Sequence, residues 1–161
     1  MTISKKMILL VLSALFGILL LSGLGYQQMN QVFTAANYGN INSVPSIVAL
    51  NKLRSAINVE IQLVYSHILT TNDAAMAEIE TRIKSSRSDI QQATEEYSKL
   101  LSDEKDRQLL EADRKGIASF LQGADGALDL SRRNENEAAR DAMLALQRDV
   151  IEPLSENLNT H

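Results

Sequence analysis

The chain carries two kinds of hydrophobic pattern, one continuous and one periodic. The run Met7–Leu24 (MILLVLSALFGILLLSGL) is uncharged and mostly apolar. Beyond it, apolar residues recur every three or four positions among polar ones. A continuous apolar run of about 20 residues is the length of helix that crosses a bilayer core, whereas the three-four spacing is typical of a helix with one buried face. The pattern therefore predicts one membrane-spanning helix followed by helices that pack together.

Four helical stretches are predicted after the apolar run. The first extends from the anchor to Thr70, with an interruption near Asn40–Pro45, and the second covers Ala74–Leu101. The third covers about Asp103–Ser131, and the fourth begins near Glu135. Short links between helices of similar length favour antiparallel neighbours. We therefore expect an all-α fold, a membrane-anchored antiparallel up-down-up-down four-helix bundle.

The second stretch has the most regular pattern in the chain. Residues three and four positions apart alternate along one face of this helix, here called its seam, as they do in near-parallel packed helices. The seam consists of Met76, Ile79, Ile83, Ser86, Ile90, Ala93, Tyr97 and Leu100. The corresponding stripes are Leu50, Leu53, Ile57, Ile61, Val64 and Ile68 in the first helix, Leu110, Ile117, Phe120, Leu121, Ala124 and Leu128 in the third, and Ala139, Met143, Leu146, Val150, Leu154 and Leu158 in the fourth. Ser102 is expected to cap the third helix. Pro153 predicts a bend or a local irregularity in the fourth.

Charge around the apolar run predicts its orientation. Lys5 and Lys6 precede it, and basic residues favour the cytoplasmic side of a membrane. We expect residues 1–6 in the cytoplasm, 7–25 as the transmembrane helix and 26–161 as a periplasmic sensor domain, in a bacterial inner membrane. The alternative is a cleaved signal peptide, for which Gly23-Leu24-Gly25 would be the cleavage site.

Composition excludes several classes of protein. The net charge is −4, and no basic stripe interleaved with aromatic residues occurs, so nucleic acid is not an expected partner. The absence of cysteine excludes disulfides, thiolate metal sites and thiol nucleophiles. The sequence contains two histidines, His67 and His161, and no motif of hydrolases, metalloproteases or dinucleotide enzymes. We therefore expect no enzyme, no metal and no cofactor.

Arginines are the strongest candidates for ligand contacts, because a guanidinium binds a carboxylate bidentately. Most arginines in the helices have an acid three or four residues away, as Arg82 has Glu78, but Arg54 and Arg87 have none. Arg82 and Arg87 flank the seam of the second helix, and Ser86 lies in it.

Two further candidates come from the outer helices of the bundle. Tyr65 flanks the stripe of the first helix, and Arg140 flanks that of the fourth. The predicted contacts of a small carboxylate (a dicarboxylic, tricarboxylic or aromatic acid) are Arg87, Arg82, Tyr65, Ser86, Arg140 and Arg54. The alternative for each arginine is an ordinary ion pair, and for Tyr65 and His67 a place in a helix interface.

Several segments resemble the N-terminal part of bacterial methyl-accepting chemotaxis receptors with a four-helix-bundle ligand domain. They are Lys5-Lys6 with the apolar run, Asn42-Ser43-Val44-Pro45-Ser46-Ile47 ahead of Leu50, Leu53 and Arg54, Thr70-Thr71-Asn72-Asp73, and Ile151-Glu152-Pro153-Leu154. The resemblance implies a homo-oligomer in which a ligand shifts the fourth helix relative to the first. It also implies a second span and a cytoplasmic part that acts on downstream chemotaxis proteins, both absent from this chain.

The sequence departs from the family's aspartate receptors, which bind their ligand with arginines on the upper first helix. The segment Glu60–Thr71 has no arginine, so an organic acid is expected rather than an amino acid held in that manner. Two alternatives remain open at this point. One is the sensor domain of a membrane histidine kinase or diguanylate cyclase, and the other is a helical stalk that binds another protein.

Overall fold

The structure, a computed structural model, describes residues 3–38 and 43–160, and within these ranges it contains helices and no strand. The elements are α1 (Ile3–Tyr38), α2 (Val44–Ile68), α3 (Asp73–Ser98), α4 (Glu104–Arg132), α5 (Asn136–Leu146), the π-helical turn η2 (Gln147–Ile151) and α6 (Glu152–Leu158). The chain divides into two compact units, residues 1–44 and 45–161.

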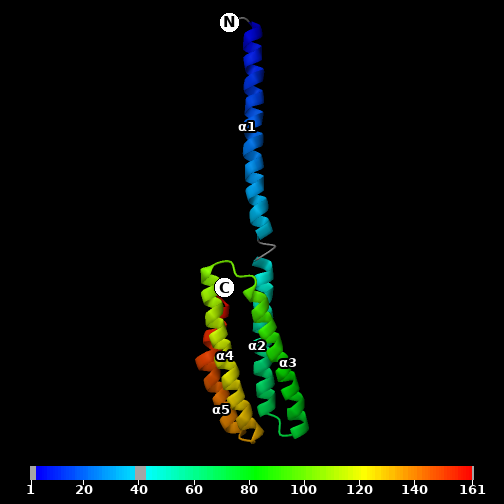
Figure 1. Cartoon of the computed structure of the whole chain (residues 1–161), viewed down its shortest axis with the longest axis vertical. Coiled ribbons are helices and arrows are strands. Elements are labelled where there is room, and N and C mark those ends of the chain that lie inside the picture. The colour runs from blue at the N-terminus through cyan, green and yellow to red at the C-terminus, as the bar shows by residue number, and fades with distance from the viewer. Residues whose placement is uncertain (1–2, 39–42, 161) are drawn as a thin grey trace. The chain divides into compact units, whose positions relative to one another are not determined.

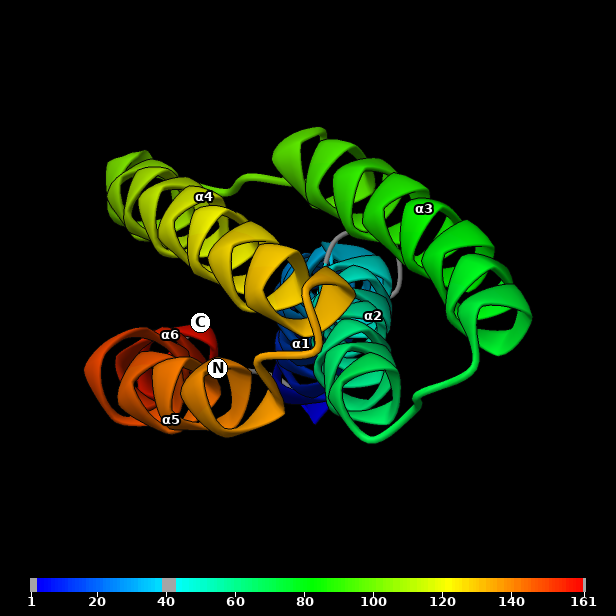
Figure 2. The same ribbon diagram turned by 90° about the horizontal axis from the view of Figure 1, so that it is seen from below.

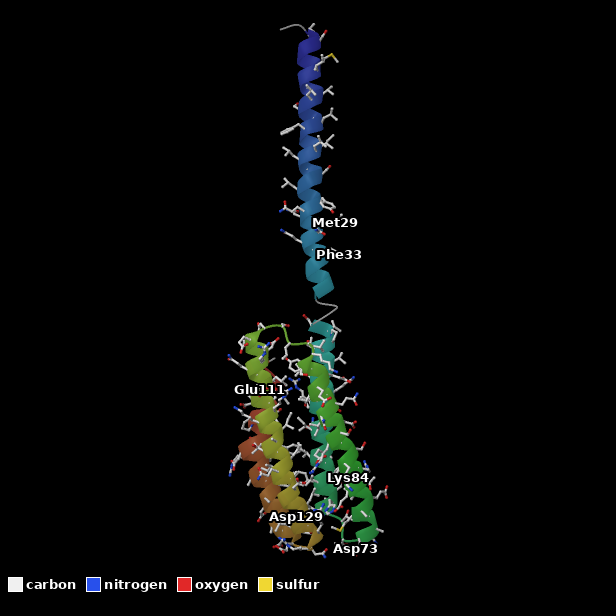
Figure 3. The ribbon with its side chains drawn as sticks, viewed as in Figure 1. Met29, Phe33, Asp73, Lys84, Glu111 and Asp129 are labelled. Atoms are coloured by element: carbon white, nitrogen blue, oxygen red, sulfur yellow. The ribbon has the colours of Figure 1, made fainter. Side chains whose placement is uncertain are left out.

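The first unit contains the long helix α1. Its segment Leu10–Phe33 is 24 residues long with a mean hydropathy of 1.8, which is long and apolar enough to cross a membrane, as a signal sequence near an N-terminus also would be. Met29 and Phe33 lie on this helix with exposed side chains (Figure 3). The candidate span overlaps the predicted one, residues 7–25. The predicted start of the sensor domain at residue 26 stays a prediction.

The second unit is an antiparallel bundle, with α5, η2 and α6 together forming its fourth helix (Figure 1). One end, here called the tip, carries the α2–α3 and α4–α5 connections; Asp73 and Asp129 lie there (Figure 3). At the other end, the base, α2 begins and α6 ends (Figure 1). Both α5 and α6 pack along α4 (Figure 2). The predicted all-α four-helix bundle is confirmed.

The predicted seams form the core of the bundle. Along α3, the buried residues are Met76, Ile83, Ser86, Ile90, Ala93 and Tyr97, with Ile79 and Leu100 half-buried. Each of the other predicted stripes is also buried, with one half-buried member per helix, namely Ile61, Leu121 and Val150. A three-four spacing therefore identified the inward face of every helix correctly.

The predicted cap of α4 is wrong by one residue. Asp103, not Ser102, is the N-cap, since its side chain accepts a hydrogen bond from the Asp106 amide at 2.9 Å. Asp106 in turn accepts from the Ser102 amide at 3.0 Å, which holds Ser102 just outside the helix. Two aspartates three residues apart thus share the free amides at this helix start, which a serine alone does not do.

The irregularity predicted at Pro153 is confirmed as the π-helical turn η2. Proline lacks an N–H and cannot continue the regular hydrogen-bond ladder. Just before it, the Glu152 amide bonds to the carbonyl of Gln147, five residues back. The extra residue in this turn shifts the buried face. As a result Ile151 is buried where the regular pattern predicted Val150, which is half-buried.

Close contact between α4 and α5 depends on a residue without a side chain. A Cβ atom on Gly123 would overlap Leu146, with Cγ of that leucine at 3.2 Å and Cδ2 at 3.0 Å. The whole branched end of Leu146 therefore occupies the space that glycine leaves. Gly126, one turn later on the same helix, faces open space, because a Cβ atom added there would meet nothing within 4 Å. It therefore serves as a matched control.

We predict opposite effects for alanine at these two glycines. Gly123→Ala should lower the free energy of unfolding by about 1–3 kcal/mol, because Leu146 must move in a close-packed interface. Gly126→Ala should raise it by about 0.5–1 kcal/mol, because alanine favours a helix and meets no neighbour. Urea denaturation followed by circular dichroism measures both values. Equal effects would contradict the packing described here.

Candidate functional site

The structure divides the six predicted ligand contacts among separate places. Arg87, the leading candidate, lies between helices and is engaged by two acids. Its Nε donates to Glu60 Oε1 on α2 at 2.8 Å, and its Nη2 donates to Asp125 Oδ1 on α4 at 2.7 Å. Glu60 is fully buried, so it needs this counter-charge. Arg87 therefore forms the ion pair that the sequence left open as the alternative, and a ligand contact at Arg87 stays a prediction.

Arg82 differs from its expected environment, whereas Ser86 lies in the seam of its helix as predicted. Arg82 is exposed and, in the described part of the chain, makes no ion pair, whereas the sequence suggested a pair with Glu78. Ser86 is buried, and its Oγ donates to the Ala56 carbonyl of α2 at 3.1 Å. Ser86 thus joins two helices, and neither residue lines the cavities described below.

Of the six residues, Tyr65 and Arg140 come together in one cavity, and their contact with a ligand stays a prediction. They line a cavity of about 580 Å³ between α2 and α5 at the tip, here called the tip cavity, with Ile68, Leu69, Asn136, Glu137 and Leu144. Arg140 contacts Asp141 Oδ1 through Nε at 3.3 Å and Nη2 at 3.1 Å, and both side chains are exposed. An exposed ion pair of this kind contributes only about 0–1 kcal/mol to stability, so Arg140 can leave Asp141 and bind another anion.

Arg54 lines a second cavity, about 290 Å³, between α2 and the η2–α6 segment, here called the base cavity. Its Nη2 donates to the backbone carbonyl of Leu158 at the end of α6. Carbonyls at a helix end lack partners within the helix, and a guanidinium there also complements the helix dipole. Arg54 therefore ties the two helices together at the base.

Unpartnered buried atoms distinguish the cavities. Two further grooves, one of about 460 Å³ beside Arg87 and one of about 370 Å³ beside Lys52, have no such atom in their lining. Asn136, which lines the tip cavity, has a buried Oδ1 without a donor, and Arg54, which lines the base cavity, has a buried Nε without an acceptor. Since buried polar atoms are normally paired, these two cavities are the better candidates for ligand sites.

A third buried cluster surrounds His67 near the tip. Ser131 Oγ lies 3.2 Å from the His67 carbonyl and 2.9 Å from Nδ1 of the imidazole. On the other side of the ring, Nε2 lies 3.3 Å from Glu80 Oε1, so a proton on Nε2 points toward the carboxylate. Glu80 is also bound by Arg132 Nε at 2.7 Å. The fully buried imidazole of His67 therefore lies between a hydroxyl and an ion-paired carboxylate.

Burial lowers the pKa of His67 below its ordinary value of 6.5, and the neighbouring Glu80 opposes this only in part. The strongest effect on Glu80 itself is its hydrogen bond with Arg132, which lowers the pKa of that carboxyl below 4.5. The two groups therefore affect stability in different pH ranges, and the range of His67 lies at higher pH than that of Glu80.

Sequence reasoning missed Asn136 and the burial of Glu60 and Asp113, whereas the helix-interface position considered for His67 agrees with its burial. Glu60 and His67 were visible on the apolar stripe of their helix, four residues before and three after Val64, and that position indicated burial. Asp113 follows the same rule between Leu110 and Ile117 of α4. Asn136 carries no comparable signal, because its burial depends on how α5 packs.

The ion pair between Arg87 and Glu60 predicts that removal of the arginine strongly lowers the free energy of unfolding. Arg87→Ala should lower the free energy of unfolding by about 3 kcal/mol, since it leaves the carboxylate of Glu60 buried without a counter-charge. Arg82→Ala, on the exposed side of the same helix, should change it by less than about 0.5 kcal/mol. Chemical denaturation of both variants measures the difference, and similar values would show that Glu60 does not depend on Arg87.

The lowered pKa of His67 predicts how the free energy of unfolding changes with pH. Well above pH 6.5 the ring is neutral in both the folded and the unfolded state and contributes no slope. As the pH falls below 6.5 the unfolded chain binds a proton before the folded one, so the free energy of unfolding should fall, by at most about 1.4 kcal/mol per pH unit. His67→Gln should remove this part of the slope between pH 5 and 6.5, above the range of Glu80. Parallel curves for the two proteins would refute the prediction.

Comparison with known proteins gives one match. A family model described as a four-helix-bundle sensory module for signal transduction matches residues 1–161. No curated protein and no solved structure matches the chain. The match covers the apolar helix as well as the bundle, and it confirms the resemblance to the sensor part of methyl-accepting chemotaxis receptors. The chain therefore belongs to the family of four-helix-bundle sensory modules for signal transduction.

Proposed function

We propose that this protein is the ligand-sensing part of a bacterial transmembrane chemoreceptor and that it binds a small organic acid in the tip cavity. The family and the apolar helix support a membrane-anchored sensor. The observation that carries the site is the meeting of Tyr65 and Arg140, from the first and last helices of the bundle, around the unpartnered Oδ1 of Asn136.

The lining of the tip cavity specifies a ligand with three features. A carboxylate suits the guanidinium of Arg140, which can replace its exposed contact with Asp141. A hydroxyl or ammonium donor suits the buried acceptor on Asn136. An apolar body suits Ile68, Leu69 and Leu144. Hydroxy acids therefore fit the cavity better than acids with no hydrogen-bond donor.

A ligand in the tip cavity contacts both α2 and α5, so it can report on their relative position. Shifts of about 1–2 Å between packed helices are an established class of switching motion. The ligand changes the balance only if it binds one arrangement more tightly than the other. In this proposal the shift passes through α1 and a second span to a cytoplasmic part that acts on downstream chemotaxis proteins.

The proposal includes an inner-membrane location with the bundle in the periplasm, and association into a homo-oligomer. Support for association comes from the start of α2, where Ile47 and Val48 are exposed and no charge occurs between Lys6 and Lys52. An exposed apolar surface of this kind is typical of a protein or membrane contact.

The test uses the full chain in lipid nanodiscs. A thermal-shift screen of organic acids and amino acids comes first, followed by calorimetric titration with phenylacetate, mandelate and phenylglycine, which carry a hydrogen, a hydroxyl or an ammonium at the same carbon. Mandelate should bind more tightly than phenylacetate. Arg140→Gln should weaken mandelate binding about tenfold or more, because a charge-assisted contact is lost.

Arg148→Gln is the matched control, since Arg148 also pairs with the acid that follows it, Asp149, but lines neither the tip cavity nor the base cavity. It should bind mandelate as the wild type does. Equal loss in both variants would show a general charge effect. Full binding of mandelate by Arg140→Gln would place the ligand outside the tip cavity, and no binding by any acid would favour a helical stalk.

A further inference from the structure

The base cavity has the features of a second ligand site, separate from the tip cavity. Its walls come from α2 on one side and from η2 and α6 on the other. Half of its lining is aliphatic (Ile57, Ile61, Ile151, Leu154 and Leu158), and its uncharged polar residues are Asn58, Gln147 and Ser155. One of the aliphatic residues, Ile151, faces inward because of the π-helical turn, and such turns occur frequently at functional sites.

Arg54 supplies an incomplete polar end to this aliphatic cavity. Its Nη2 donates to the Leu158 carbonyl, while its Nε is buried and has no acceptor. A buried donor without a partner is unfavourable, and a charged donor more so. An oxygen of a bound anion can accept from Nε without disturbing the contact with Leu158, because each N–H of the guanidinium points to its own acceptor.

The other charged residue of the lining limits the ligand to one negative charge. Glu152 is exposed at the edge of the cavity, where it would repel a second carboxylate. The aliphatic wall favours a hydrocarbon chain over a polar body. We propose that the base cavity binds a short aliphatic monocarboxylate, with the carboxylate on Arg54 Nε and the chain against α6.

This site would act on the same pair of helices as the tip cavity, but from the opposite end of the bundle. A molecule held between α2 and α6 contacts both, and it therefore favours whichever arrangement of the two leaves the cavity open. The inference does not depend on the proposed function, because binding of a monocarboxylate at Arg54 can be measured whether or not the tip cavity holds a ligand.

The test is equilibrium dialysis of radiolabelled hexanoate against the full chain in nanodiscs, with empty nanodiscs as the blank. Saturable binding of hexanoate is expected, with no competition by hexanamide, its neutral analogue. Arg54→Lys keeps the charge and can still donate to Leu158, but it lacks the Nε donor, so it should bind about ten- to a hundredfold more weakly. Arg148→Lys, on exposed η2, is the matched control and should bind as the wild type does.

Two further variants keep the test informative if Arg54→Lys is unstable. Ser155→Phe on the exposed side of the lining should fill the cavity and abolish binding, whereas Glu152→Gln should strengthen it by removing a repulsive charge. Absence of saturable binding, or wild-type binding by both Arg54→Lys and Ser155→Phe, would overturn the proposal. Loss in Arg140→Gln with retention in Arg54→Lys would also overturn it, by placing hexanoate at the tip.

Discussion

The fully buried carboxylate of Glu60 determines how three of the four helices of the bundle can be arranged. A buried charge is tolerated only with a counter-charge in good geometry. Arg87 on α3 provides this counter-charge through its Nε, and its Nη2 donates a second hydrogen bond to Asp125 on α4. Sliding α2 along α3 would break the 2.8 Å hydrogen bond and leave Glu60 uncompensated, and sliding α4 along α3 would break the 2.7 Å hydrogen bond to Asp125. The pair therefore fixes the register of α2, α3 and α4 in addition to contributing to stability.

The fourth helix is held differently. In the described part of the chain, the ion pairs of α5 and η2 stay within their own segment, between Arg140 and Asp141 and between Arg148 and Asp149. Its contacts with α4 at the tip half are apolar packing, as at Gly123 and Leu146. Apolar contacts are not directional, so they oppose a small sliding motion less than a buried ion pair does.

Most of the fold was predictable from the spacing of apolar residues, because burial of one helix face depends on residues of the same helix. What periodicity could not show was contact between helices. Arg87 has no acid three or four residues away, yet two acids reach it from α2 and α4. Conversely Arg82 has Glu78 one turn away and does not pair with it in the described structure. The candidate site was therefore predicted only for Tyr65 and Arg140, and the unpartnered Asn136 that completes it needed the structure.

The two candidate cavities occur between α2 and the fourth helix, an interface at which the described residues form no ion pair. At the base, α6 is tied to α2 through Arg54 and to α4 through Asn157, whose Nδ2 donates to the buried Asp113 at 2.6 Å. The π-helical turn separates this anchored segment from α5. In the proposed function a ligand at the tip therefore has to overcome only apolar packing to move α5, whereas movement of α2 against α3 would unpair Glu60. Differential affinity of a few kcal/mol between two arrangements is enough to shift such an equilibrium, so the fourth helix is the element that a small ligand can move.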